Sequence, residues 1–126
     1  MTTATGFTIN RMSIQLLVND LERSVAFYTN MLGFDVEFRY EAFYAGLIKD
    51  GCSLHLKSGI PSGTKRTQKE NEDTDVLFSV SDIEKICKEL QDKQVLFIQP
   101  LRQMPYGKEF YIGDPDGHVL AFIQEG

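Results

Sequence analysis

Two side chains able to bind metals or transfer protons lie in segments with the pattern of β-strands. His55 stands inside the alternating segment 52–57, and Asp75 begins the segment 75–79. An imidazole beside a carboxylate can hold a divalent metal ion or exchange hydrogen bonds with a bound ligand. Either side chain can equally stand on a solvated sheet, or, for Asp75, at an exposed strand start. These alternatives stay open until the surrounding residues are considered.

Strand alternation groups these two residues with other polar side chains. Successive strand residues point to opposite faces of a sheet. In three predicted strands the apolar residues share one face, which must pack under helices. The opposite, mixed face receives Ser13, Gln15, Ser53, His55, Lys57 and Asp75. Such a face either meets solvent or lines the inside of a curled sheet that binds a ligand.

Aromatic residues near the same strands favour the ligand-binding alternative. Binding pockets are mostly apolar with a few placed polar groups. The aromatic residues concerned are Phe38, Tyr40, Phe43, Tyr44, Phe110 and Tyr111. We take Tyr44 and Phe110 as candidate ligand contacts. Lys57 and Arg102 are candidate contacts to an anionic group, or simply residues that flank strand ends.

The elements that position these residues occur twice. The segment Val18-Asn19-Asp20-Leu21-Glu22-Arg23 is echoed by Val80-Ser81-Asp82-Ile83-Glu84-Lys85. Helical spacing of apolar residues follows each copy: Leu21, Val25, Tyr28 and Leu32, then Ile83, Ile86, Cys87 and Leu90. Asp20 and Asp82 stand where a helix N-cap belongs. A repeat of this kind indicates that one structural unit is duplicated.

Strands complete each unit after its helix. Gly33 is expected to end the first helix, and strands are predicted at 35–40, 43–49 and 52–57, with Asp50-Gly51 as a hairpin turn. In the second unit the predicted strands are 96–102, 108–113 and 118–124, with a turn at Asp114-Pro115-Asp116-Gly117. Each unit is therefore βαβββ, and the predicted fold class is α+β.

The chain of 126 residues is expected to form one domain, 1–126. Module one covers about 10–57 and module two about 75–124. The polar segment 58–74 between them is either a solvated linker or a mobile lid over a pocket.

Composition excludes several kinds of partner. A net charge of −5 argues against nucleic acid and anionic membrane surfaces, since both need a basic face. No apolar run approaches the roughly 20 residues of a membrane span, and segment 1–6 lacks the features of a secretory signal. Cys52 and Cys87 lack metal-binding spacing, so we expect buried, reduced thiols in a cytoplasmic protein.

Two parts of the sequence form recognisable motifs. The first is Val18-x-Asp20-Leu21-x-x-Ser24-x-x-Phe27-Tyr28-x-x-x-Leu32-Gly33-Phe34. The second is Pro105-Tyr106-Gly107 followed by Asp114-Pro115-Asp116-Gly117-His118. Together they resemble the signatures of the vicinal oxygen chelate superfamily, which includes glyoxalase I, bleomycin-resistance and fosfomycin-resistance proteins, and extradiol dioxygenases. The resemblance implies a curled, cup-shaped mixed sheet with the helices on its outer face, and modules that pair in a homodimer.

The resemblance also implies where a metal would bind. Metal-dependent members take ligands from four strand positions, which fall on Ser13, His55, Asp75 and Ala121. Neutral Ser13 is a poor ligand and Ala121 has no ligand atom, whereas a catalytic site normally needs three protein ligands. Gln15, two residues along on the same face, is an alternative to Ser13. We therefore expect no cofactor, with Zn, Mn, Ni or Fe on His55 and Asp75 as the alternative.

Two functions from different classes remain. The favoured one is a metal-free small-molecule binding protein of the bleomycin-resistance type, with its ligand in a cup between modules. The alternative is a metal-dependent lyase, isomerase or dioxygenase with a reduced site on His55 and Asp75. Glyoxalase-like proton abstraction lacks support, because Asp75 is the one carboxylate placed on the cup face. Strand alternation places His118 on the same face as Leu120 and Phe122, away from the cup, so we expect His118 to be structural.

Overall fold

The computed structural model describes residues 6–59 and 73–126. Most of segment 58–74 falls outside this part of the chain, and so does the question of whether it is a linker or a lid.

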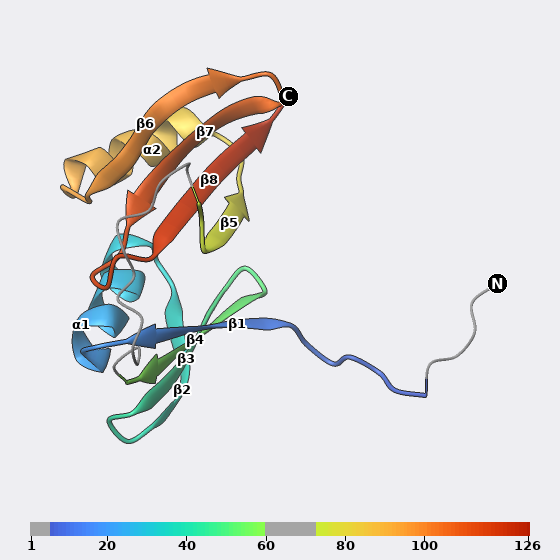
Figure 1. Ribbon diagram of the computed structural model, residues 1–126, viewed down its shortest axis with the longest axis vertical. Coiled ribbons are helices and arrows are strands. Elements are labelled where there is room, and N and C mark those ends of the chain that lie inside the picture. The colour runs from blue at the N-terminus through green and yellow to red at the C-terminus, as the bar shows by residue number, and fades with distance from the viewer. Residues whose placement is uncertain (1–5, 60–72) are drawn as a thin grey trace.

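The described elements follow one order twice: a strand, a helix and three strands (Figure 1). Module one consists of β1 (Ser13–Val18), α1 (Leu21–Ala26), η1 (Phe27–Met31), β2 (Asp35–Tyr40), β3 (Tyr44–Lys49) and β4 (Cys52–Ser58). Module two consists of β5 (Val76–Ser79), α2 (Ile83–Asp92), β6 (Phe97–Met104), β7 (Gly107–Gly113) and β8 (Val119–Glu125). The predicted βαβββ repeat and the α+β fold class are confirmed.

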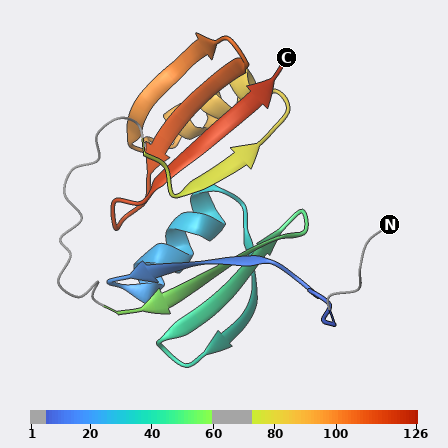
Figure 2. The ribbon, with the colours of Figure 1, turned by 45° about the vertical axis from the view of Figure 1, so that its right-hand side comes forward.

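Each module forms a four-stranded mixed sheet of its own, in the order β1-β4-β3-β2 or β5-β8-β7-β6. The first strand of each sheet pairs in parallel with the last, and the other pairs are antiparallel. In Figure 2 the two sheets are separate and unclosed, and α1 lies between its own sheet and module two. Each sheet therefore keeps one face for the core and one face that is open.

One hydrophobic core runs through both modules. It joins residues of β1 and β4, such as Leu16 and Leu54, to residues of β8, such as Leu120 and Phe122. Gln15, which neighbours Leu16 on β1, is exposed, so the predicted alternation holds. Burying each large apolar side chain stabilises the fold by about 1.5–3 kcal/mol. The core therefore fixes the direction in which each mixed face points.

The two helices begin differently. Asp20 caps α1 as predicted, because its Oδ1 accepts a hydrogen bond from the Arg23 amide at 3.1 Å. The same prediction is wrong for Asp82, whose φ of 57° is left-handed and whose side chain makes no capping hydrogen bond. Gln124 in β8 caps α2 instead, because its Oε1 accepts a hydrogen bond from the Ile83 amide at 2.8 Å.

Positive φ angles shape two turns of module one as predicted. Gly33, at φ 80°, follows η1 and ends the first helix. Asp50 and Gly51, at φ 50° and 80°, connect β3 to β4 in a two-residue hairpin that pairs Lys49 with Cys52.

The two cysteines are both free, but only Cys87 is buried. The expectation of a buried thiol is wrong for Cys52, because it begins β4 directly after the exposed hairpin turn. Within the part of the chain that the structure describes, no helix is long and apolar enough to cross a membrane.

Hydrogen bonds clasp the first helix of module one to the β7–β8 turn of module two. The Tyr28 hydroxyl donates to Asp114 Oδ2 at 2.7 Å. Asp116 accepts from the Asn19 amide at 2.9 Å and from Ser24 Oγ at 3.2 Å. The acidic turn therefore joins the modules by binding donors at both ends of the helical segment.

Candidate functional site

A row of four residues crosses the mixed face of module one. Strand register places Gln15 of β1 beside His55 of β4. His55 lies beside Gly46 of β3, which lies beside Phe38 of β2. Tyr44 belongs to the neighbouring row on β3. All four strands of the sheet therefore contribute to one continuous surface.

Gly46 lets an aromatic ring lie over the middle of this surface. A Cβ at position 46 would stand 2.2 Å from Phe38 Cε2, closer than non-bonded carbon atoms approach. The Phe38 ring lies edge-on to His55 at 5.3 Å and parallel to Tyr44 at 6.2 Å between ring centroids. Tyr40, which is 60% exposed, extends the patch at 5.5 Å from Phe38. We call Phe38, Tyr40, Tyr44 and His55 the aromatic patch.

Three polar side chains on this face are hydrogen-bonded in series. Gln15 Nε2 donates to the Tyr44 hydroxyl at 2.9 Å. The same hydroxyl lies 2.8 Å from His55 Nδ1. We call this series the Gln15–Tyr44–His55 chain. It brings together three of the side chains that the sequence singled out.

The other predicted residues of module one lie beside this chain without joining it. Ser13 pairs in register with Ser53, and its Oγ donates to Ser53 Oγ at 2.7 Å. Gln15, rather than Ser13, stands opposite His55. Lys57 is exposed and pairs with Tyr44 across β3 and β4.

The predicted residues of module two are engaged with their own sheet. Asp75 Oδ2 accepts a hydrogen bond from the Val119 amide at 2.8 Å, and the Asp75 amide donates back to the Val119 carbonyl at 2.8 Å. Ala121 is buried in a small cluster with Tyr111 and Val119. Phe110 is fully buried in the core, where its ring stacks on Phe122 at 4.9 Å. Phe110 thus stands apart from the other candidates, on the core face of β7.

Sequence reasoning missed a buried carboxylate on the mixed face of module two. Glu109 is 4% exposed and accepts hydrogen bonds from Arg102 Nε at 2.8 Å, from Tyr106 at 2.6 Å and from Tyr111 at 3.3 Å. The hydrogen bond to Glu109 raises the pKa of Tyr106 to about 12. Alternation along β7 would have found Glu109, since it shares the face of Tyr111. Arg102 therefore faces a carboxylate of its own sheet.

The four positions that the family implies for a metal do not fit one. Ser13 is bonded to another hydroxyl, Ala121 offers no ligand atom, and Asp75 accepts a backbone hydrogen bond. A metal-binding histidine normally donates its second ring nitrogen to an acceptor. His55 Nδ1 faces the Tyr44 hydroxyl, which can accept its hydrogen, so His55 alone would suit a metal and the misfit lies in the other three positions. No step of a mechanism is therefore assigned to a metal ion.

A different cluster has its ligand atoms within 4.8 Å of one another: Asp114, Asp116 and His118. Asp114 Oδ1 accepts from the amides of Asp116 and His118, at 2.9 and 2.8 Å. Its Oδ2 accepts from Tyr28 and contacts His118 Nδ1 at 2.8 Å. Both oxygens are thus occupied by protein donors, so the cluster serves as part of the clasp between modules.

The electrostatics of this cluster agree with a structural role. Burial opposes the charge of Asp114, but hydrogen bonds from His118 and Tyr28 outweigh burial and hold its pKa below the ordinary value. Burial likewise opposes protonation of His118, but Asp114 outweighs burial and raises its pKa. Burial and the Asp114 charge raise the pKa of Tyr28 far above its ordinary value, so its hydroxyl stays protonated and donates. The prediction that His118 is structural agrees with this geometry.

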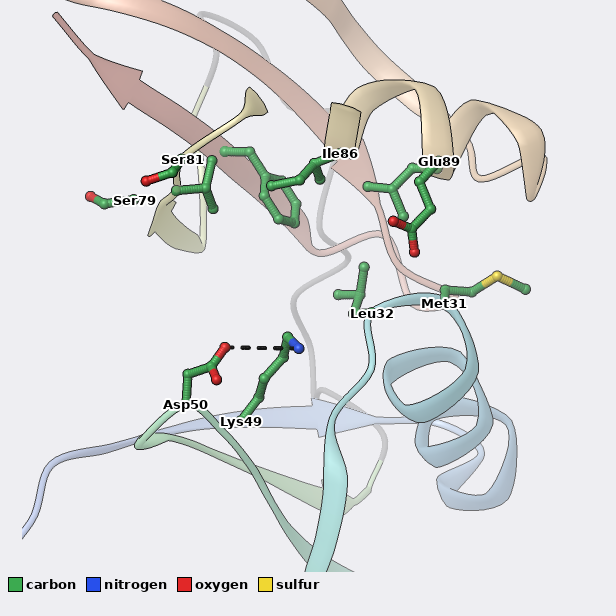
Figure 3. Close-up of a pocket in the computed structure, with 11 residues that line it drawn as sticks. Met31, Leu32, Lys49, Asp50, Ser79, Ser81, Ile86 and Glu89 are labelled. Carbon is green, nitrogen blue, oxygen red and sulfur yellow. Dashed lines mark ion pairs between the residues drawn. The ribbon is translucent and has the colours of Figure 1, made fainter. Parts of the chain in front are cut away.

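A groove of about 450 Å³ lies between the modules (Figure 3). Leu32 and the Lys49–Asp50 ion pair, 3.8 Å between Nζ and Oδ2, border it from module one. Ile86 and Glu89 border it from α2. None of the predicted site residues lines this groove, so it is separate from the aromatic patch.

The fold and the sequence match one family. The model of the glyoxalase/bleomycin resistance protein/dioxygenase superfamily matches residues 8–122, and the chain belongs to this superfamily. The resemblance seen in the two sequence signatures is thereby confirmed. No curated protein sequence matches the chain.

Solved structures share the fold at low sequence identity. TioX from Micromonospora sp. ML1 is 20% identical, with a TM-score of 0.76 over 93% of this chain and 99% of its own. TnmS3, an antibiotic binding protein from Streptomyces sp. CB03234, is 21% identical, with a TM-score of 0.75 over 98% and 100%. FosX, a fosfomycin resistance protein from Listeria monocytogenes, is 16% identical, with a TM-score of 0.74 over 95% and 96%. At these identities the likeness is one of fold.

Proposed function

We propose that this protein binds a small, planar, aromatic molecule on the mixed face of module one, without a metal ion. The observation that carries the proposal is the aromatic patch, in which Phe38 lies across the sheet because position 46 has no side chain. Aromatic faces stack on planar ligands, and pockets combine apolar walls with a few polar groups. Gln15 supplies polarity beside the patch. The antibiotic-binding and resistance functions of TnmS3 and FosX support small-molecule binding.

The metal-dependent enzyme has less support. Such an enzyme would need Asp75 beside His55 as a ligand, yet Asp75 Oδ2 accepts a hydrogen bond from the Val119 amide of its own sheet. Neither Ser13 nor Ala121 adds a third ligand.

We propose that a second copy of the chain closes the site in a homodimer. Large apolar side chains are exposed in module two: Leu77 of β5, on the mixed face, is 61% exposed, and Leu96, directly before β6, is 68% exposed. Phe7 and Ile9 are also exposed, on the segment before β1 that extends away from both sheets (Figure 1). Exposed apolar surface of this kind marks interaction sites. A monomeric mass in light scattering at micromolar concentration would contradict the dimer.

We place the protein in the cytoplasm. Support comes from Cys52 and Cys87, which are both free, as expected of thiols in a reducing compartment.

The binding proposal is tested by titrating the protein with 9-fluorenone, a planar three-ring ketone, and following binding by calorimetry. Replacing Phe38 by Ala removes a stacking surface and is expected to weaken binding about tenfold. Phe43→Ala is the matched control, because Phe43 is an exposed aromatic residue of the same hairpin outside the aromatic patch. Equal effects of the two substitutions would contradict the proposed site.

Metal dependence is tested on the same protein after dialysis against a chelator. Fluorenone binding is expected to be unchanged, and elemental analysis is expected to find no stoichiometric metal. A stoichiometric ion that disappears in His55→Ala would instead overturn the metal-free proposal and favour the metal-dependent alternative.

A further inference from the structure

The Gln15–Tyr44–His55 chain favours one position for the proton of the Tyr44 hydroxyl. A primary amide nitrogen only donates, so the Tyr44 oxygen accepts from Gln15 Nε2. The Tyr44 oxygen has lone pairs for two donors, so its 2.8 Å contact with His55 Nδ1 fits either direction. We assign the hydroxyl proton to this contact, because within the described residues no other acceptor faces the Tyr44 hydroxyl. A neutral imidazole with a lone pair on Nδ1 carries its own hydrogen on Nε2.

The Nε2 hydrogen is available to a bound molecule. His55 is partly exposed on the mixed face, and within the described residues no hydrogen-bond partner faces its Nε2. The Phe38 ring stands edge-on to the imidazole and supplies no oxygen. A ligand that covered the aromatic patch without offering an acceptor would leave this donor buried and unpaired, which is costly.

We infer that the site selects planar ligands that carry a hydrogen-bond acceptor in the ring plane, such as a ring carbonyl oxygen, through the Nε2 hydrogen of His55. This inference rests on the proposed function and adds the polarity of the ligand to it. Tyr44 is the positioning residue, because it acts on the ligand through His55 and holds the imidazole in one tautomer.

Module two offers no equivalent donor. Strand register pairs Gln15 with His55 in module one and Leu77 with Ala121 in module two. The two apolar residues occupy the positions of the amide and the imidazole. Recognition of a polar atom by this device therefore belongs to module one.

Three probes of nearly the same shape isolate the effect. 9-Fluorenone offers a carbonyl acceptor, fluorene offers neither acceptor nor donor, and carbazole offers an N–H donor. One net hydrogen bond predicts that the protein binds fluorenone about fivefold more tightly than fluorene. Carbazole is expected to bind more weakly than fluorene, because two donors would face each other. The carbonyl stretch of bound fluorenone should move to lower frequency in the infrared spectrum.

Tyr44→Phe keeps the ring but removes the hydroxyl, so His55 is free to exchange tautomers. The preference for fluorenone over carbazole should then fall to less than about twofold, within the noise of one weak hydrogen bond. The carbonyl frequency of bound fluorenone should stay lowered, because the ketone still selects the tautomer that carries hydrogen on Nε2. Tyr106→Phe is the control, since it removes a half-exposed tyrosine hydroxyl from module two, outside the aromatic patch. It should keep the wild-type preference.

The outcomes separate this inference from the proposed function. A preference for carbazole, equal binding of the three probes, or an undiminished preference for fluorenone over carbazole in Tyr44→Phe overturns the inference and leaves aromatic binding standing. Failure of all three probes to bind overturns the proposed function, and the inference with it.

Discussion

At two matching positions of the repeat, module one carries polar side chains and module two carries apolar ones. Gln15 and His55 face each other across β1 and β4, whereas Leu77 and Ala121 face each other across β5 and β8. The backbone pairing is the same in both sheets. The polar contact proposed for a ligand on module one therefore has no counterpart at the same positions of module two.

A second pair of strand positions differs in burial as well as in chemistry. Tyr44 on β3 pairs with Lys57, is partly exposed, and reaches into the neighbouring row to bind Gln15 and His55. Glu109 on β7 is buried and accepts hydrogen bonds from Arg102 and other residues of its own module. One position thus serves the proposed site, and the other stabilises its own sheet.

The turns between the last two strands differ most. Asp50 in module one forms a two-residue hairpin, and its side chain is 85% exposed. Asp114 in module two is buried and holds Tyr28 of module one. We expect Asp114→Asn to lower the free energy of unfolding by about 3 kcal/mol, because an amide leaves several buried donors unmatched. Urea denaturation measures the change.

Asp50→Asn is the control for this comparison, since asparagine tolerates the same left-handed conformation. It should change stability by less than about 0.5 kcal/mol. Similar losses of unfolding free energy in the two variants would show that the hydrogen bonds of Asp114 between the modules do not stabilise the fold.

The second largest effect is expected at Glu109. Glu109→Gln should lower the free energy of unfolding by about 2 kcal/mol, because the substitution removes the buried charge that pairs with Arg102. Tyr44→Phe should cost less than about 1 kcal/mol, since its hydroxyl is only partly buried. Thermal unfolding of both variants checks the order. The reverse order would refute the division into a stabilising and a ligand-binding position.

The helix starts predict a smaller difference. Asp20→Ala removes the side-chain cap of α1 and should lower the free energy of unfolding by about 1 kcal/mol. Asp82→Gly should be neutral or slightly stabilising, because φ at this position is 57° and the side chain makes no cap. Denaturant midpoints measured side by side test this. A loss at Asp82 equal to that at Asp20 would contradict the assignment of the α2 cap to Gln124.

The smallest effect concerns pH. Burial lowers the pKa of His118 in the folded protein, but the hydrogen bond and the charge of Asp114 outweigh burial and raise this pKa above its ordinary value of 6.5. Its contribution to stability is therefore complete below pH 6.5 and is lost as pH rises through the folded pKa. The pKa of Asp114 is lowered from 3.8, so its contribution is present above that value and is lost on acidification. Unfolding free energies measured across pH should fall at both ends, and the alkaline fall should vanish in His118→Phe.

Local patterns in the sequence determined the elements and their faces. Strand and helix periods depend on neighbouring residues, so alternation placed Gln15 and His55 on one face and the helical spacing placed Cys87 in the core. The repeat predicted two βαβββ modules, and Asp20 was predicted as a cap because capping is a contact within one turn. These features need no knowledge of distant residues.

Only the tertiary structure decided which side chains meet. Phe110 was expected near a ligand, but the packing of β7 turns it into the core beside Phe122. Gln124 rather than Asp82 caps α2, because β8 brings it to the helix start. Tyr44 meets His55 because strand register and the missing side chain at position 46 leave room for the aromatic patch. Such contacts join residues far apart in the chain, so they depend on how sheets pair and pack rather than on any local pattern.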